Sequence, residues 1–404
     1  MQRIVGAAYS QACRPGRLFA HNLAGAMRYA FCCQVVGAGL LSGLALPACG
    51  QSLAPAPDTM QAPRMPFIFG ASAQGSIIIS HAAPVAHLVA SHPLGLELSV
   101  QRQTTGRQLW HAWYRFPKLG ASLVYYDYRN PVLGQSLAAT VYLNKSFSRT
   151  ARHDFSLRVG TGLAYFTEHY DLYDNRKNTF IGTPLNAVLQ LRLEYDYALA
   201  PHLGLLLGLG LNHYSNGATG KPNYGINLPT VSVGLHYYQQ RPAARRSGYA
   251  PAPPGVGRNF LNLSTSLAWK QRSPADTRTY LVNSLTLAAG RRLNRKSNLL
   301  LGVEGFYDRS LRAAQLDTAR DTRSLPDTRK AAVFVGHELL FGRLAVVTHL
   351  GAYFYNPYKS NAFYYERIGL KYHFTPWLFG AVDLKVHRTV ADALELKAGV
   401  RLGQ

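Results

Sequence analysis

The sequence predicts an all-β protein: a closed antiparallel transmembrane β-barrel of the outer membrane with about 14–16 strands. Three observations lead to this fold class. Segments of about ten residues with alternating polar and apolar positions recur from residue 94 to the end of the chain. The connections between these segments alternate between short and long. After the first fifty residues, no stretch holds the roughly 18 consecutive apolar residues of a transmembrane helix.

The composition narrows the class of protein. The chain has 404 residues and a formal net charge of +23, yet only 16% of its residues are charged. It is rich in Tyr (25) and Gly (36). Disorder needs denser charge and lower hydrophobicity, and a coiled coil needs more Ala, Glu, Lys and Leu. A basic balance indicates nucleic acid or an anionic membrane as partner. The Tyr- and Gly-rich composition favours the membrane, so no nucleic acid is expected.

Residues 1–50 resemble a leader with a signal peptide. Arg28 precedes the apolar run AFCCQVVGAGLLSGLALPA, and the small residues Ala48-Cys49-Gly50 follow it. A basic start, an apolar middle and small residues at the cleavage site are the marks of secretion. Met27 is an alternative start, and a lipoprotein anchored on Cys49 is an alternative product. Residues 51–73 are expected to form a Pro-rich periplasmic segment.

All four cysteines fall within this leader: Cys13, Cys32, Cys33 and Cys49. The exported part is therefore expected to be free of cysteine. This excludes a disulfide, a thiolate metal site and a cysteine nucleophile from it.

We expect the barrel to occupy residues 74–404, with sixteen strands. The first eight are predicted over 94–102, 108–116, 119–127, 134–146, 154–168, 186–200, 203–215 and 227–239. The second eight are predicted over 258–270, 279–292, 297–308, 329–342, 343–354, 363–374, 377–388 and 392–402. Inward-facing Glu304 and Glu338 are expected in a packed polar lumen.

The connections set the orientation. Those after even-numbered strands are short, whereas the long ones, 169–184, 216–226 and 309–328, follow odd-numbered strands. Outer-membrane barrels place short turns in the periplasm and long loops outside the cell. The linker 240–257 lies on the short side but is long and rich in Pro and Arg. It favours one large barrel with a periplasmic excursion; the alternative is two eight-stranded units joined by this linker.

The hairpin 203–238 carries the candidate chemistry. Alternate residues of a strand face opposite sides, so Leu203 to Leu211 form a leucine stripe at odd-numbered positions. His213 and Ser215 continue that lipid-facing stripe to the extracellular rim. In the returning strand, Asn227 shares the outward parity.

A histidine two residues from a serine on one face can take the proton of the serine hydroxyl. An acyl transfer also needs donors for the oxyanion. The side chains of Asn216 and Asn223 and the backbone at Gly217 are candidates for this role. The simpler interpretation is that these are ordinary polar residues at a membrane interface.

The run His213-Tyr214-Ser215-Asn216, followed by Pro222-Asn223-Tyr224-Gly225-Ile226-Asn227, resembles the signature of the PagL-type lipid A deacylases, also called acyloxyacyl hydrolases. The resemblance covers most of residues 70–404. It implies an outer-membrane β-barrel with a Ser nucleophile and a His base that cleaves an ester-linked acyl chain from lipid A.

By position, the resemblance implies Ser215 as nucleophile, His213 as general base, Asn216 as oxyanion donor and Asn223 as support. At Asn227 the family often has a carboxylate that orients the histidine. Asparagine can accept a hydrogen bond from imidazole but cannot stabilise imidazolium by charge. Beside the oxyanion hole, Gly217 and Ala218 stand where a small pair in the opposite order is expected.

The expected partner is lipopolysaccharide in the outer leaflet, with Lys221 contacting a substrate phosphate; a homodimer is an open alternative to a monomer. No cofactor and no metal are expected, since the sequence has no matching motif. The alternative function is a non-catalytic barrel, either a pore or a structural protein that retains the hairpin.

Overall fold

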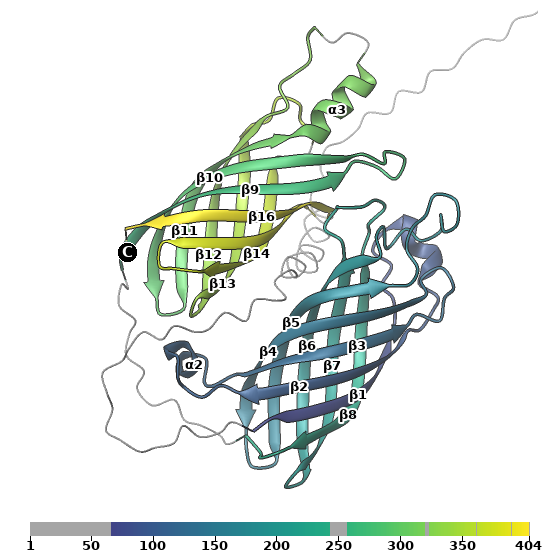
Figure 1. Ribbon diagram of the computed structural model, residues 1–404, viewed down its shortest axis with the longest axis vertical. Coiled ribbons are helices and arrows are strands. Elements are labelled where there is room, and N and C mark those ends of the chain that lie inside the picture. The colour runs from purple at the N-terminus through teal and green to yellow at the C-terminus, as the bar shows by residue number, and fades with distance from the viewer. Residues whose placement is uncertain (1–65, 243–256, 320–322, 361, 389, 404) are drawn as a thin grey trace, which may run out of the picture.

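The computed structural model describes residues 66–242, 257–319, 323–360, 362–388 and 390–403, which form two closed antiparallel barrels (Figure 1). The first barrel consists of β1 (Ile68–Ser76), β2 (Leu94–Gln103), β3 (Lys118–Asp127), β4 (Gln135–Arg149), β5 (His153–Phe166), β6 (Leu185–Ala200), β7 (Leu203–Ser215) and β8 (Ile226–Tyr238). The second consists of β9 (Asn259–Gln271), β10 (Thr279–Asn294), β11 (Ser297–Asp308), β12 (Lys330–Phe341), β13 (Leu344–Tyr355), β14 (Tyr364–His373), β15 (Leu378–His387) and β16 (Val390–Leu402). Three short helices lie in connections: η1 (Ala83–Leu88), α2 (Leu109–Trp113) and α3 (Arg309–Thr318).

The alternation in the sequence produces the two faces of each wall. In β9, Leu261, Leu263 and Trp269 point outward and are exposed, while Asn262 and Ser266 point inward and are buried. Apolar side chains therefore surround each barrel, as a lipid environment requires, and polar side chains fill it. No helix of the described residues is long and apolar enough to cross a membrane.

Ion pairs fill both lumens. In the first barrel, Glu97 accepts hydrogen bonds from Arg158 at 2.5 Å and from Arg192 at 2.7 Å. In the second, Arg367 bonds to Glu304 at 2.7 Å, and Arg401 bonds to Glu338 at 2.8 Å. An eight-stranded barrel is narrow enough for its side chains to fill it. The expectation that Glu304 and Glu338 belong to a packed lumen is confirmed.

The preference for one large barrel is wrong, and the alternative of two eight-stranded units is right. Strand β8 pairs with β1, and β16 pairs with β9, so each half of the chain closes on itself. The all-β class, the antiparallel order and the total of sixteen strands are confirmed. Alternation along a strand is the same in either arrangement, because it does not specify which strand closes the sheet.

Two elements differ from the predicted strands. Strand β1 begins at Ile68, inside the expected Pro-rich periplasmic segment 51–73. It was not predicted, because its small residues make the alternation faint. Residues 108–116 contain the helix α2 instead of a strand. There, Trp110, Trp113 and Tyr114 recur at helical spacing and form one buried cluster. The unpredicted strand β1 and the wrongly predicted strand 108–116 cancel, so the predicted total of sixteen strands is correct. The expected leader lies outside the described residues.

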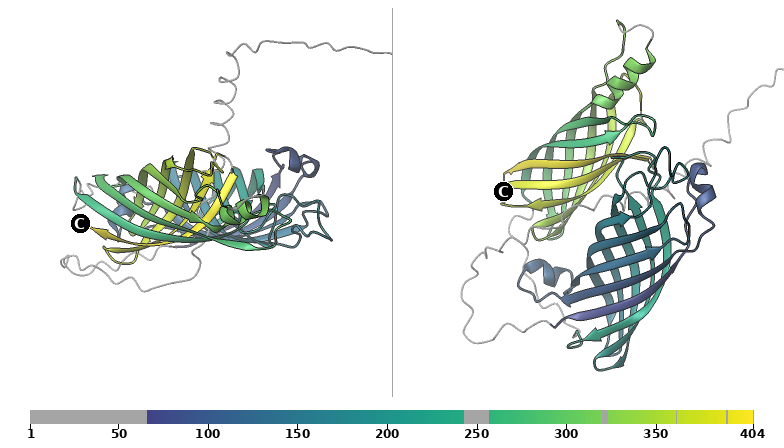
Figure 2. Two further views of the ribbon diagram at one scale, coloured as in Figure 1. Left: turned by 90° about the horizontal axis from the view of Figure 1, so that it is seen from above. Right: turned by 45° about the vertical axis from the view of Figure 1, so that its right-hand side comes forward.

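The two barrels lie side by side (Figures 1 and 2). We call the end that carries the connections 104–117, 150–152 and 342–343 the short-turn end, and the opposite one the long-loop end. At the short-turn end, α2 of the first barrel reaches the turn between β12 and β13. Tyr114 stacks on Phe341 with ring centroids 4.5 Å apart, and its hydroxyl donates to the Leu340 carbonyl at 3.0 Å. Both barrels therefore share one orientation.

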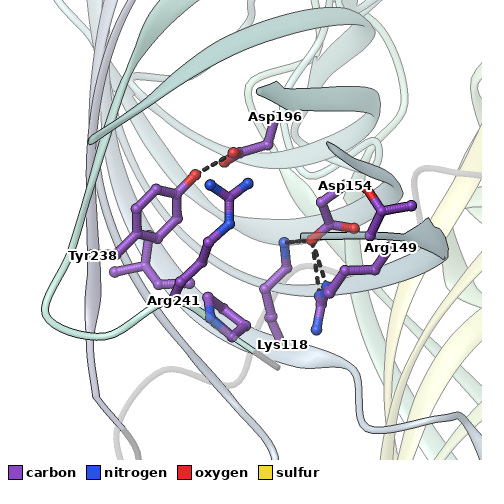
Figure 3. Close-up of a pocket in the computed structure, with 9 residues that line it drawn as sticks. Lys118, Arg149, Asp154, Asp196, Tyr238 and Arg241 are labelled. Atoms are coloured by element: carbon purple, nitrogen blue, oxygen red, sulfur yellow. Dashed lines mark hydrogen bonds and ion pairs between the residues drawn. The ribbon is translucent and has the colours of Figure 1, made fainter. Parts of the chain in front are cut away.

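A small polar pocket lies at the short-turn end of the first barrel (Figure 3). Lys118 and Arg149 both contact the Asp154 carboxylate there, at 3.0 and 2.8 Å. The Tyr238 hydroxyl donates to Asp196 nearby. With Arg241, the lining has three cations and two carboxylates, and the pocket is separated by the length of the barrel from the hairpin end at Ser215.

Candidate active site

Strand β7 places the candidate residues on the outer wall at the long-loop end. Asn212 faces the lumen, where it donates to the Tyr126 hydroxyl at 3.1 Å. The odd-numbered positions therefore face outward, and Leu209 among them is 62% exposed. His213 and Ser215 continue this face but are only 8% and 4% exposed. The outer face of β7 is therefore covered by other parts of the chain at the long-loop end.

Two donors converge on the Ser215 hydroxyl from the loop 216–225, which we call the active-site loop. The Asn223 Nδ2 donates to Ser215 Oγ at 2.9 Å, and the Gly217 backbone N–H donates to it at 3.3 Å. Asn223 Oδ1 in turn accepts from the backbone N–H of Asn216 at 3.2 Å. Two N–H groups of this loop are therefore aimed at the hydroxyl oxygen of Ser215.

The side chain of Asn216 holds the loop itself. Its Nδ2 donates to Thr183 Oγ1 at 3.1 Å and to the Gly220 carbonyl at 3.0 Å, and its Oδ1 accepts from the Ala218 N–H at 3.0 Å. All these bonds lie within the loops of the first barrel. The structure therefore places the amide of Asn223, and not that of Asn216, at the serine.

His213 and Asn227 are register partners on β7 and β8. His213 Nδ1 lies 2.5 Å from Asn227 Oδ1. The expected pairing of these two side chains is therefore present in the structure. Antiparallel neighbours across a hairpin have their side chains close enough for such a contact.

A third residue, His81, completes a chain of hydrogen bonds. Its Nε2 lies 2.9 Å from the Tyr224 carbonyl, which can only accept, so Nε2 carries a proton. Its Nδ1 lies 3.3 Å from Asn227 Nδ2 and 3.3 Å from the Ile79 carbonyl oxygen. The Asn227 amide therefore lies between the two histidines, with Nδ2 toward His81 and Oδ1 toward His213.

No pattern in the sequence points to His81. It follows β1, which was not predicted, and it meets Asn227 only because β1 pairs with β8. The predicted strands contained no such pairing.

Gly225 allows the loop to approach the imidazole. Its φ of +73° is unfavourable for residues with a Cβ. A Cβ placed there would lie 2.9 Å from His213 Cε1 and 3.2 Å from Nε2. Glycine at this position therefore keeps the Nε2 edge of His213 clear.

The structure differs from the expected site at two places, the Ser215–His213 pair and Lys221. Among the hydrogen bonds of the described residues, none joins Ser215 to His213. Lys221 lies at the second barrel, with its backbone N–H donating to Gln271 Oε1 at 2.7 Å. Burial lowers the pKa of the Lys221 ammonium, while the nearby Asp392 carboxylate acts in the opposite direction.

Comparison with known proteins yields matches in both halves of the chain. The family model described as lipid A 3-O-deacylase (PagL) matches residues 94–236. The model described as acyloxyacyl hydrolase, C-terminal domain, matches residues 259–404. No curated protein matches the sequence.

Several solved structures are similar in part. Neisserial surface protein A is 13% identical, with 42% of this chain and 96% of that chain covered and a TM-score of 0.31. The outer membrane enzyme PagL is 16% identical, with 41% and 97% covered and a TM-score of 0.27. A triple mutant of the Rhodopseudomonas blastica porin is 10% identical, with 84% and 100% covered and a TM-score of 0.17.

The boundary between the two family models falls at the linker between the barrels: the first covers β2 to β8 and the second covers β9 to β16. The first includes the hairpin with His213 and Ser215. The apolar outer walls and the family matches place the protein in the outer membrane. The chain belongs to the PagL family of acyloxyacyl hydrolases.

Proposed function

We propose that this protein is a serine esterase that removes an ester-linked acyl chain from lipid A in the outer leaflet. The observation that carries the proposal is the convergence of the Asn223 amide and the Gly217 N–H on Ser215 Oγ. This serine lies two residues from a histidine whose Nδ1 is already bonded. The family description, lipid A 3-O-deacylase, names the ester at position 3 as the expected bond.

The reaction begins when Ser215 Oγ exchanges its loop donors for His213. Both side chains are on the same face of β7, and catalytic hydrogen bonds often tighten only when substrate binds. The hydroxyl proton passes to His213 Nε2 as Oγ attacks the ester carbonyl carbon. The carbonyl oxygen becomes an oxyanion, which takes the N–H groups of Gly217 and Asn223 that Oγ has released.

Collapse of this intermediate breaks the ester bond. The protonated His213 gives its proton to the departing lipid A hydroxyl, and the acyl chain stays on Ser215. Water then attacks the acyl-enzyme with His213 as base. This step releases the fatty acid and restores the serine.

Asn227 and His81 hold the base in its working tautomer. Asn227 has no charge with which to stabilise imidazolium, so its contribution is orientation. The contact of Asn227 Nδ2 with His81 Nδ1 favours the amide orientation in which Oδ1 faces His213. The neutral Asn227 thus orients His213, which is one of the two roles that a carboxylate would have at this position.

The packed lumens argue against the alternative of a pore. Arg158, Arg192 and Arg367 are among the most deeply buried side chains of the described residues, and each is paired with a glutamate. A conducting path would require these ion pairs to separate. Breaking a buried ion pair costs about 3–5 kcal/mol.

The test is mass spectrometry of lipid A from cells that express the wild type, Ser215→Ala or Ser232→Ala at equal outer-membrane levels. Ser232 is a buried serine of the β8 lumen face and serves as the matched control. We expect loss of one acyl chain with the wild type and Ser232→Ala, and unmodified lipid A with Ser215→Ala. Equal deacylation by Ser215→Ala would refute the serine mechanism. The fragment pattern identifies the ester cleaved.

A further inference from the structure

The second barrel contacts the active-site loop directly through Gln271, the last residue of β9. Its backbone N–H donates to the Ala218 carbonyl at 3.2 Å, and its side-chain Oε1 accepts from the Lys221 N–H at 2.7 Å. Its Nε2 donates to the Asp276 carbonyl at 2.8 Å, which fixes the amide with Oε1 toward the loop. One residue thus holds both sides of the turn 218–221.

An apolar contact accompanies these bonds. A Cβ at Gly217 would lie 2.9 Å from Leu394 Cβ and 3.4 Å from Leu384 Cδ1. Leu384 belongs to the outward face of β15, since its neighbours Asp383 and Lys385 form ion pairs inside the barrel. It is nevertheless only 2% exposed. Part of the lipid-facing wall of the second barrel is therefore covered, and Gly217 of the active-site loop contacts it.

The active-site loop needs external support. Ala218 has a φ of +75°, a left-handed conformation that residues with a Cβ adopt at a cost. Such conformations persist only where the surroundings determine them. Ala218 directly follows Gly217, whose N–H is one of the two donors at Ser215. A change in the backbone at Ala218 would therefore redirect this donor.

We propose that the second barrel is a positioning domain of the esterase and that Gln271 is its positioning residue. Through Ala218 and Lys221 it fixes the active-site loop, and through the loop it fixes the N–H groups that serve the oxyanion. The inference rests on the proposed function and assigns to the C-terminal barrel a part in the same reaction. Gln271 itself does not touch Ser215.

The kinetic test compares Gln271→Ala with Thr279→Ala in the full chain. Thr279 is the register partner of Gln271 on β10 and is exposed, so it is a matched control. Loss of the bond to Lys221 is expected to lower kcat about tenfold, which is the size of one hydrogen bond. KM for lipid A is expected to stay unchanged, because the oxyanion donors act in the transition state and not in substrate binding. Thr279→Ala is expected to keep both constants.

A second measurement tests the contact without relying on activity. The chain has no cysteine after Cys49, so the pair Gly217→Cys and Leu394→Cys is a clean probe. A disulfide needs Cβ atoms about 3.5–4.5 Å apart, which a small shift of this contact provides. We expect oxidation of outer membranes to give a cross-linked peptide in mass spectrometry.

The outcomes separate the two proposals. An inactive wild type would overturn the proposed function and this inference with it. An active wild type with equal kcat in Gln271→Ala and Thr279→Ala would overturn the inference alone. Absence of the cross-link in a double variant that still folds and reaches the outer membrane would also overturn it, because the second barrel would then not contact the loop in the membrane.

Discussion

Replacing Gly225 with alanine tests how closely the active-site loop must approach His213. The new Cβ would lie 2.9 Å from His213 Cε1 and 2.9 Å from the Tyr214 carbonyl oxygen. Carbon atoms in contact prefer about 3.5–4.0 Å, so the imidazole or the loop must shift by about 0.6 Å or more. The φ of +73° adds about 1–2 kcal/mol of backbone strain.

The displacement acts on the reaction more than on the fold. A shift of about 1 Å in a catalytic group can cost about 10²-fold in rate, so we expect kcat to fall by about 10- to 100-fold. The strain lowers the free energy of unfolding by about 1–2 kcal/mol. A barrel that forms correctly but turns over slowly is therefore the expected product.

The assay is the initial rate of acyl release from lipid A in outer membranes, with unfolding in urea measured on the same preparations. Gly75→Ala is the control, because a Cβ on that β1 glycine meets no atom within 4 Å. We expect it to retain full activity and stability. If Gly225→Ala turns over as fast as Gly75→Ala, the loop does not control His213 and the reasoning fails.

Two further substitutions test the hydrogen-bond chain and the lumen. His81→Ala removes the partner of Asn227 Nδ2 and is expected to lower kcat about tenfold at constant KM; an unchanged rate would show that Asn227 needs no orienting bond. Glu97→Gln removes the nearer of the two carboxylates that Arg158 and Arg192 share, leaving Glu194 at 3.5 and 3.9 Å, and is expected to destabilise the first barrel by about 1–3 kcal/mol. Urea unfolding measures this loss, and a loss below 1 kcal/mol would mean that water replaces the carboxylate.

Much of the fold could be predicted from local pattern. The leucines of β7 alternate with glycine and polar residues, and the predicted strand 203–215 has the same bounds as β7. Strand β8 begins one residue before its predicted start. The pairing of His213 with Asn227 was expected only from the family resemblance, because the long loop 216–225 does not by itself fix the register of the hairpin.

The features that were missed depend on contacts between distant segments. The alternation of polar and apolar residues is the same whether β8 pairs with β1 or with β9. It therefore cannot distinguish one barrel from two. His81 and Gln271 reach the site only through that closure and through the contact between the barrels. The helix α2 was read as a strand because Trp and Tyr favour strands, and its burial depends on Phe341 of the other barrel.

The filled lumens have a consequence for how the rate of this enzyme should be expressed. Because ion pairs fill the described part of both lumens, lipid A is expected to reach the outer wall of β7 by diffusing sideways in the leaflet, and the products leave the same way. The relevant concentration is then the mole fraction of lipid A in the membrane surface, not its amount per volume. Dilution of the leaflet with inert phospholipid should slow turnover at constant total lipid A, whereas dilution of the whole suspension should not.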